Sequence, residues 1–272
     1  MPIPVRRWIR RMRGGCQAHL VEAGDGHCYI LKPRNNPQHR RILVNEWLSS
    51  VFLEYLQIQT PQVALLETDA ALHRDFPEFS IQLGGRHVPV DAGWHFGSRF
   101  PGDPDRLAVF DFLPDALLFK VANLRDFAGA LVFDKWVANA DSRQAIFYRA
   151  QLRDSAGPPR VAFVASMIDS GYAFEGPNWV FTDAAMQGLY HRKQIYQMLR
   201  GWSDLEPWLA RVESFPEAVV DQAWRAIPRD WLRGDEAALE ALLERLLARR
   251  RQVRAIIERS RFAKPEFFPN WR

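Results

Sequence analysis

Several short segments of the chain carry side chains that could handle a phosphoryl group. Lys32 ends the apolar run CYILK, and a proline and a polar loop follow at once. A lysine in that place either deters edge-to-edge pairing of strands or carries a cation to an anionic ligand. Upstream lie Gly14 and Gly15, and glycines let a backbone approach phosphate oxygens closely. Each feature alone is also typical of an ordinary strand end or turn, so the other segments decide the interpretation.

Three acidic residues follow in an order that suits metal-dependent phosphoryl transfer. Glu46 falls on a predicted helix face that is apolar or small, where a buried carboxylate would need Lys32 as its partner; an exposed Glu46 is the alternative. Asp141 lies in FDKWVANADSRQAIFY, where a predicted helix gives way to a strand. Asp169 ends an apolar run and precedes Ser-Gly, which suits a metal-binding carboxylate and also an ordinary turn.

Taken together, these segments have the order of a protein-kinase-like site. That order is glycine loop, strand lysine, helix glutamate, loop aspartate and strand-end aspartate. In this interpretation Lys32 holds phosphates, Glu46 holds Lys32, Asp141 orients the acceptor hydroxyl and Asp169 binds Mg²⁺. The sequence therefore predicts ATP and Mg²⁺ as cofactors.

The predicted elements divide the chain into two parts. Residues 1–102 read mostly as strands, including a hairpin at GDG and a strand at TPQVALLET, with one helix at about 40–56. Residues 103–272 read mainly as helices, with two strands, SRQAIFYRAQL and RVAFVASMIDSG, joined by the turn RDSAGPPR. We expect an α+β, two-lobed protein-kinase-like fold: a small sheet-rich N-lobe (1–102) with the phosphate loop and the Lys/Glu pair, and a larger helical C-lobe (103–272) with the catalytic and metal loops.

Two further segments carry specific expectations. HFGSRFPGDP combines aromatic residues, glycine and proline, and is predicted to be extended and to cross between the lobes near the base of the nucleotide. The clearest helix begins near Asp235, a good N-cap, and its leucine stripe is predicted to pack in the core.

Composition favours a soluble globular protein over several other classes. Of the 272 residues, 47% are hydrophobic and 25% are charged, and no apolar run is long enough to span a membrane. Cys16 and Cys28 are too few for a disulfide framework or a cysteine-rich zinc site, so we expect a cytoplasmic location. Much of the net charge of +4 arises near residues 6–13 and in RLLARRRQVRAIIERSRF. Both regions could contact nucleic acid or simply form solvated faces.

The chain resembles the HipA-like kinases, bacterial serine/threonine-kinase-like proteins, and in particular their short stand-alone branch. The segments that carry the resemblance are RGGCQAHLVEAGDGHCYILKPRNNPQHRRILVNEWLSS, GWHFGSRFPGDP, LVFDKWVANADSRQAIFYR and MIDSGYAFEGPNW. They span about residues 13–179, with weaker similarity in the helical tail. The resemblance implies transfer of a phosphoryl group from ATP to a Ser or Thr hydroxyl of a protein whose identity the sequence does not reveal.

We expect the following site residues. Nucleotide contacts are expected at Gly14, Gly15, Cys16, Gln17, Lys32, Phe96, Gly97, Ser98, Arg99 and Phe100; catalytic roles at Asp141, Lys32 and Glu46; and metal ligation at Asp169 and Gln144.

The chain departs from the family pattern at three places. Ile146 stands where the wider family often has a metal-binding Asn, with Gln144 or Asn139 as possible substitutes, and Cys16 stands where serine is usual. The usual Asp-Arg pair reads Asp141-Ser142-Arg143. Two alternatives to an active kinase therefore stay open: a nucleotide-binding pseudokinase that acts as an interaction module, and a basic nucleic-acid-associated protein without catalysis.

Overall fold

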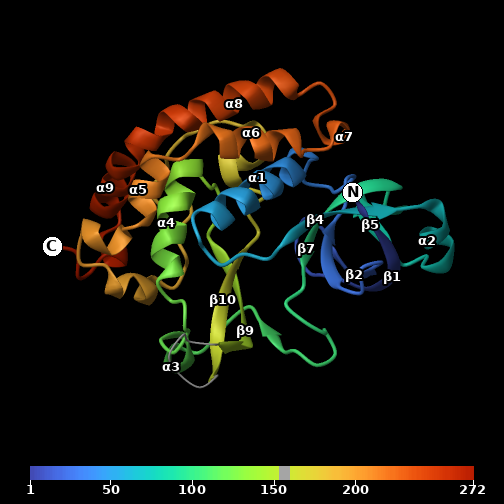
Figure 1. The fold of residues 1–272 in the computed structure, drawn as a ribbon, viewed down its shortest axis with the longest axis horizontal. Helices are drawn as coiled ribbons and strands as arrows, with labels where there is room; N and C mark the ends of the chain where they lie inside the picture. Colours follow the sequence, from blue (N-terminus) through green and yellow to red (C-terminus); the bar gives the residue numbers. More distant parts are fainter. Residues whose placement is uncertain (153–159) are drawn as a thin grey trace.

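The computed structural model describes residues 1–152 and 160–272. Figure 1 shows a β-barrel on one side of the molecule and the long helices on the other, with α1 between them and the β9–β10 strand pair below. Residues 153–159, which hold most of the predicted turn RDSAGPPR, lie outside the described residues.

The barrel is closed by five strands in the order β1-β2-β3-β7-β4. The strands are β1 (Ile3–Arg11), β2 (His19–Ala23), β3 (Cys28–Lys32), β4 (Val63–Thr68) and β7 (Gly93–Arg99). Neighbouring strands are antiparallel except β1 and β4, whose short parallel pairing closes the barrel. The hairpin predicted at GDG is β2–β3. In the register of β3 and β7, Lys32 lies opposite Phe96.

A small apolar core fills the barrel. Its fully buried members include Val21, Leu31 and Leu66, and Phe79 joins them from the segment that precedes β5. The short hairpin of β5 (Ser80–Leu83) and β6 (Arg86–Pro89) and the helix α2 (Ala70–Asp75) complete this part. Burial is nearly continuous along β2 and β3, where all residues except the half-buried Glu22, Cys28 and Ile30 are buried.

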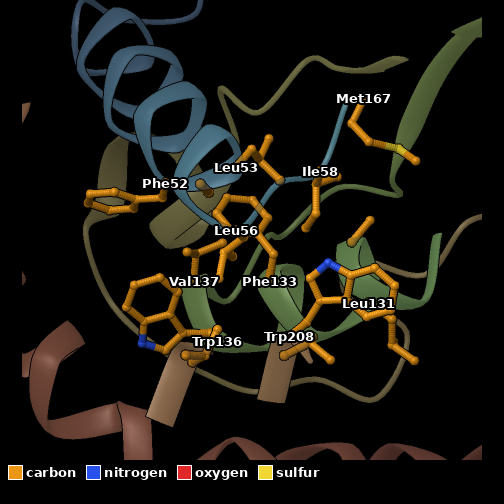
Figure 2. Close-up of a cluster of buried hydrophobic side chains, with 14 of the residues drawn as sticks. Phe52, Leu53, Leu56, Ile58, Leu131, Phe133, Trp136, Val137, Met167 and Trp208 are labelled. Carbon is orange, nitrogen blue, oxygen red and sulfur yellow. The ribbon is translucent and has the colours of Figure 1, made fainter. Parts of the chain in front are cut away.

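The larger core joins α1 (Arg41–Tyr55) to the rest of the chain. Figure 2 shows the end of α1 packed on α4 (Asp126–Val137). The contact is made by Phe52 and Leu53 of α1, and by Leu56 directly after it, with Phe133 and Trp136 of α4. The predicted lobe boundary near residue 102 stays a prediction. Helix α1 precedes this boundary, yet it shares a core with residues that follow the boundary.

The remaining elements follow in chain order. They are β8 (Val109–Phe110), α3 (Asp115–Leu118), β9 (Gln144–Leu152), β10 (Arg160–Ile168), η1 (Ala173–Asn178), η2 (Lys193–Met198), η3 (Trp202–Leu205), α5 (Trp208–Glu213), α6 (Glu217–Arg225), α7 (Arg229–Leu232), α8 (Glu236–Arg249), η4 (Arg250–Gln252), α9 (Val253–Ala263) and η5 (Pro265–Phe267), where η marks a 3₁₀ helix. The two strands predicted after α4 are β9 and β10, and β8 adds a short third strand to them. Among the described residues, no helix has the length and apolar character needed to cross a membrane.

Helix α8 begins where the sequence predicts, but Asp235 does not cap it with its side chain. The carboxylate instead accepts two hydrogen bonds from the guanidinium of Arg41, at 2.8 and 2.6 Å. A bidentate bond to a guanidinium is stronger than a cap bond to a backbone amide, so the arginine prevails. The leucine stripe of α8 is buried as predicted, at Leu239, Leu242, Leu243 and Leu246.

Candidate active site

Three elements bring Lys32, Glu46 and Asp169 together. The Nζ atom of Lys32, at the end of β3, donates to Oε1 of Glu46 on α1 and, at 2.8 Å, to Oδ1 of Asp169 directly after β10. Only 8% of Lys32 and 4% of Glu46 are exposed, whereas the Asp169 side chain is 40% exposed. The predicted pairing of Lys32 with a buried Glu46 is present, and Asp169 is its solvent-facing partner.

Burial and opposite charge set the protonation of this cluster. Burial by itself lowers the pKa of Lys32, but the carboxylates of Glu46 and Asp169 more than offset it and hold the pKa above the usual value. The Lys32 ammonium holds the pKa of Asp169 below its usual range. Burial raises the pKa of Glu46, against the opposing effect of Lys32. At neutral pH Lys32 is thus a cation and Asp169 an anion, the charges that phosphate and a divalent metal require.

The chain after Asp169 is fastened to α1 by Asn45, a residue that the sequence interpretation missed. Asn45 Nδ2 lies 2.7 Å from the carbonyl oxygen of Gly171, and the same nitrogen contacts the carbonyl oxygens of Ala173 and Gly176 at 3.0 and 2.9 Å. Its Oδ1 accepts from Trp179 Nε1 at 2.8 Å. Asn45 is completely buried one residue before Glu46. The signal that could have pointed to Asn45 was its position directly before Glu46, a predicted site carboxylate.

The glycine segment lies beside the charged cluster. Gly14 and Gln17 close a turn through a backbone hydrogen bond of 3.1 Å, and Cys16 within it is 8% exposed. Burial raises the pKa of Cys16 to about 12, with Lys32 the next largest influence, in the lowering direction. The thiol is therefore protonated and close to the lysine. The side chain of Gln17 is engaged elsewhere, because it bonds the backbone of Gln82 at 2.8 and 2.7 Å.

A buried ion pair supports the loop that carries Asp141. Arg143 donates to both carboxylate oxygens of Asp134, at 2.9 and 2.8 Å, and Asn139 donates to the same carboxylate at 2.9 Å. Asn139 also accepts from the backbone N–H of Asp141 at 3.3 Å, while Asp141 itself is exposed. Asn139 is thus committed to the loop, which makes it a poor substitute for the absent metal-binding Asn. The sequence did not reveal this supporting role of Asp134 and Arg143.

Strand β9, which pairs with β10, carries the other metal candidates. Gln144 pairs with Ile168, the residue directly before Asp169, and Ile146 pairs with Ser166. Gln144 is exposed and Ile146 is half-buried. Within the described ranges no three His, Cys, Asp or Glu side chains gather as a ready-made metal site.

The predicted base-contacting segment is mostly strand β7. Phe96 is buried in the larger core, and a Cβ at Gly97 would stand 2.6 Å from the Leu66 side chain. Arg99 contacts His27 and Gln62. Since these side chains are engaged inside the protein, the backbone and the half-buried Ser98 and Phe100 remain for a ligand. A role of these residues in contacting a nucleotide remains a prediction.

Ion pairs with acidic side chains take up much of the positive charge in the C-terminal basic region. Most arginines near the C-terminus form ion pairs that fasten α8 and α9, namely Arg249 and Arg259 with Asp183, Arg250 with Glu217, Arg254 with Glu206 and Glu213, and Arg261 with Glu258. On β1, Arg7 pairs with Glu22 at 2.9 Å. The C-terminal charge is thus largely balanced within the fold, which removes part of the basis for the nucleic-acid alternative.

Comparisons with known proteins agree with this geometry. A family model described as HipA-like kinase matches residues 5–267. The crystal structure of the Golgi casein kinase with Mn/ADP bound is similar over 94% of this chain and 73% of that chain, with a TM-score of 0.51 at 12% identity. A second crystal structure of the Golgi casein kinase covers 98% of this chain and 72% of that chain, with a TM-score of 0.46 at 12% identity. No curated protein sequence matches significantly. The first likeness shows a protein-kinase-like fold.

Proposed function

Since the chain belongs to the HipA-like kinase family, we propose that it binds ATP with Mg²⁺ and transfers the γ-phosphoryl group to a Ser or Thr hydroxyl of a protein. In this proposal residues 1–102 form the N-lobe and residues 103–272 the C-lobe. The observation that carries the proposal is the contact of Lys32 with both Glu46 and Asp169. Two consecutive elements, β3 and α1, meet there with a residue 137 positions after Lys32, and in this proposal they bring together a phosphate-binding cation, its support and a metal-binding anion.

The proposed roles of Lys32, Glu46 and Asp141 follow from their surroundings. Glu46 is buried and holds Lys32 in one orientation, so Lys32 can bind phosphate oxygens without losing further side-chain freedom. Asp141 is exposed on a loop held by Asn139, as a group that meets a protein acceptor must be. There it orients the acceptor hydroxyl and takes its proton.

The residues present fit a magnesium ion. The Asp169 carboxylate is ionised, partly exposed and offers hard oxygen atoms, and Gln144 offers an amide oxygen on the adjacent strand. Mg²⁺ commonly uses one or two carboxylates together with phosphates and water. When bound, the metal would neutralise phosphate charge.

Ile146 supports a second candidate, a nucleotide-binding pseudokinase. An isoleucine cannot ligate a metal, and Asn139 is already bonded to Asp134. In that case ATP would bind but no phosphoryl group would be transferred.

Incubation with radiolabelled ATP and Mg²⁺, with and without cell extract, separates these functions. A labelled protein band that depends on Mg²⁺ and disappears with Asp141→Asn is expected for the kinase. ATP binding with no labelled protein, including in an Ile146→Asn variant, would leave the pseudokinase. Absence of ATP binding altogether, in calorimetry with Mg²⁺, would remove both.

A further inference from the structure

Three arginines line a small pocket where the barrel meets α1 and α7, apart from the Lys32 cluster. The pocket has a volume of ≈ 90 Å³ and is lined by Arg34 after β3, Arg40 before α1 and Arg233 after α7, together with Asn35, Asp91 and Asp230. Figure 1 shows α7 at the end of the helical part that faces the barrel. The hydrogen bond of 3.0 Å from Trp231 Nε1 to the backbone oxygen of Trp94 joins these two parts beside the pocket.

The guanidinium group of Arg34 is poorly satisfied, and that of Arg40 bonds the carbonyl oxygen of Leu232 at 3.1 Å through Nη2. Arg34 reaches Asp230 only at 3.5 Å and Asp91 at 3.9 Å, beyond the 2.7–2.9 Å or so of a good charge-assisted hydrogen bond. The Nε atom of Arg40 is buried and has no hydrogen-bond partner among the described residues. A buried donor without a partner is costly, so a shift of the Arg40 side chain that brings Nε to an acceptor in the pocket is favourable.

The nearby carboxylates do not neutralise the three arginines. Asp235 is committed to Arg41 through two short hydrogen bonds and gives Arg40 only one contact, at 3.3 Å. Asp91 accepts from Asn35 at 3.1 Å. The Asp230 side chain is 72% exposed, so water screens its charge. The pocket is therefore lined by three arginines and two aspartates, and one of these aspartates lies mostly in solvent.

We propose that this pocket binds one phosphoryl oxyanion, either free or carried on a phosphorylated side chain. Guanidinium forks match the tetrahedral oxygens of phosphate, and the first turn of the 15-residue helix α1 adds a favourable dipole. The pocket volume of ≈ 90 Å³ corresponds to about three liquid waters of about 30 Å³ each, which is room for one phosphoryl group. The oxyanion replaces the long contacts of Arg34, and it accepts from Arg40 once that side chain shifts to expose Nε.

The position of the pocket gives the oxyanion a regulatory effect, a consequence that rests on the proposed function. Arg34 is two residues after Lys32. Arg40 is the N-cap of α1, the helix that carries Glu46 six residues later. An anion that bridges the two arginines joins the end of β3 to the start of α1. It thereby stabilises the Lys32–Glu46 contact and strengthens ATP binding.

Thermal unfolding of the full chain tests the site. At constant ionic strength, replacing chloride with inorganic phosphate at about 100-fold above its Kd should raise the Tm by roughly 5 °C. Arg34→Gln and Arg40→Gln should each weaken the phosphate affinity at least about tenfold, measured against the Tm of the same variant without phosphate. Arg106→Gln, which alters an arginine that is 88% exposed, is the matched control and should leave the shift unchanged.

Two variants separate this site from the nucleotide site and from a purely structural ion pair. Lys32→Ala should lose ATP affinity but keep the phosphate-induced shift; loss of the shift in Lys32→Ala would place the phosphate at the nucleotide site and overturn the proposal. Asp230→Asn should strengthen phosphate binding by removing a competing carboxylate. If Asp230→Asn only lowers the Tm and leaves the phosphate shift unchanged, Arg34 and Asp230 form a structural pair and the proposal is wrong.

A peptide arm identifies the source of the oxyanion. Fluorescence anisotropy with a phosphoserine peptide and its unphosphorylated form, in competition with inorganic phosphate, shows whether a phosphorylated side chain enters the pocket. If the phosphopeptide binds in competition with inorganic phosphate and the unphosphorylated peptide does not bind, the oxyanion is carried on a protein. If inorganic phosphate binds and the phosphopeptide does not, the oxyanion is the free ion. Failure of both phosphate and phosphopeptide to respond to Arg40→Gln overturns the site, while ATP binding in the same variant reports on the proposed function separately.

Discussion

Gly171 packs so tightly against α1 that a Cβ atom there would stand 3.2 Å from Oε1 of Glu46 and 2.5 Å from Cγ2 of Ile42. The need for glycine at this position arises from packing and not from a left-handed backbone. This contact sets the spacing between the helix that carries Glu46 and the segment that begins at Asp169.

Gly171→Ala should therefore damage both stability and ATP binding. The added methyl group must displace Ile42 or Glu46, at a cost of about 1–3 kcal/mol in the free energy of unfolding, and it moves Glu46 away from Lys32. Urea unfolding and calorimetric ATP titration measure the two effects. Gly201→Ala is the control, because nothing lies within 4 Å of a Cβ at Gly201. Equal behaviour of the two variants would contradict the packing argument.

Lys32→Ala should weaken ATP binding by at least about tenfold, since it removes the phosphate-binding cation. Glu46→Ala should have a smaller effect in the same direction, because Lys32 keeps its charge and its contact with Asp169. Lys32→Ala also leaves Glu46 buried without its cation, so Lys32→Ala with Glu46→Gln should be more stable than Lys32→Ala alone. Unchanged ATP affinity in Lys32→Ala would refute the assignment.

The loop and strand-end aspartates should fail in different ways. Asp141→Asn should remove phosphoryl transfer but spare Mg-ATP binding, because the proposed place of Asp141 is at the acceptor hydroxyl and not on the metal or the phosphates of ATP. Asp169→Asn should remove transfer and also weaken the dependence of ATP binding on Mg²⁺, since an amide offers an oxygen without a charge. A titration of Mg²⁺ against ATP binding in both variants tests this. A metal defect in Asp141→Asn alone would reverse the two assignments.

Arg143→Met should destabilise the fold by about 3–5 kcal/mol, because it leaves the buried Asp134 carboxylate without its cation. The double variant Arg143→Met with Asp134→Leu should recover part of that loss. Arg7→Met breaks an exposed pair with Glu22 and should cost less than about 1 kcal/mol. Denaturant unfolding compares the three, and a loss in Arg143→Met no larger than in Arg7→Met would show that the buried pair is unimportant.

Acid should unfold the barrel through two buried histidines. Burial lowers the pKa of His19 to about 4 and that of His95 to about 3, and each uses a ring nitrogen to accept a hydrogen bond, from Trp8 and from the backbone of Arg34 respectively. Below pH 6.5 the unfolded imidazoles bind protons that the folded ones do not, so stability is lost as the pH falls from 6.5 towards 4. The loss between pH 7 and 5 should be about 2 kcal/mol per histidine.

Urea unfolding at several pH values measures this loss. His19→Gln should reduce the slope of stability against pH, whereas His87→Gln should not, because His87 is exposed on β6. A slope that is the same in the native chain and in His19→Gln would show that other groups control the acid sensitivity.

Local sequence determined much of the secondary structure and the order of the site residues. The GDG hairpin, the helix at 41–55 and the two strands after α4 follow from turn chemistry and apolar periodicity, which act over a few residues. The position of Lys32 at the end of its strand followed from the same patterns. The sequence left open whether Glu46 is buried against Lys32 or exposed, and the structure shows that it is buried. The resemblance to the HipA-like kinases was also present in the sequence, and the match over residues 5–267 confirms the family.

Only the tertiary structure decided which side chains the site depends on. Asp235 resembles a helix cap, yet it binds Arg41, which is nearly 200 residues away in sequence. Asn45 bonds to the segment after Asp169, and Asp134 pairs with Arg143 inside the core. These partners meet because burial removes water and forces each polar group to find a hydrogen bond wherever the fold brings one. That choice depends on long-range packing, which no local pattern of residues records.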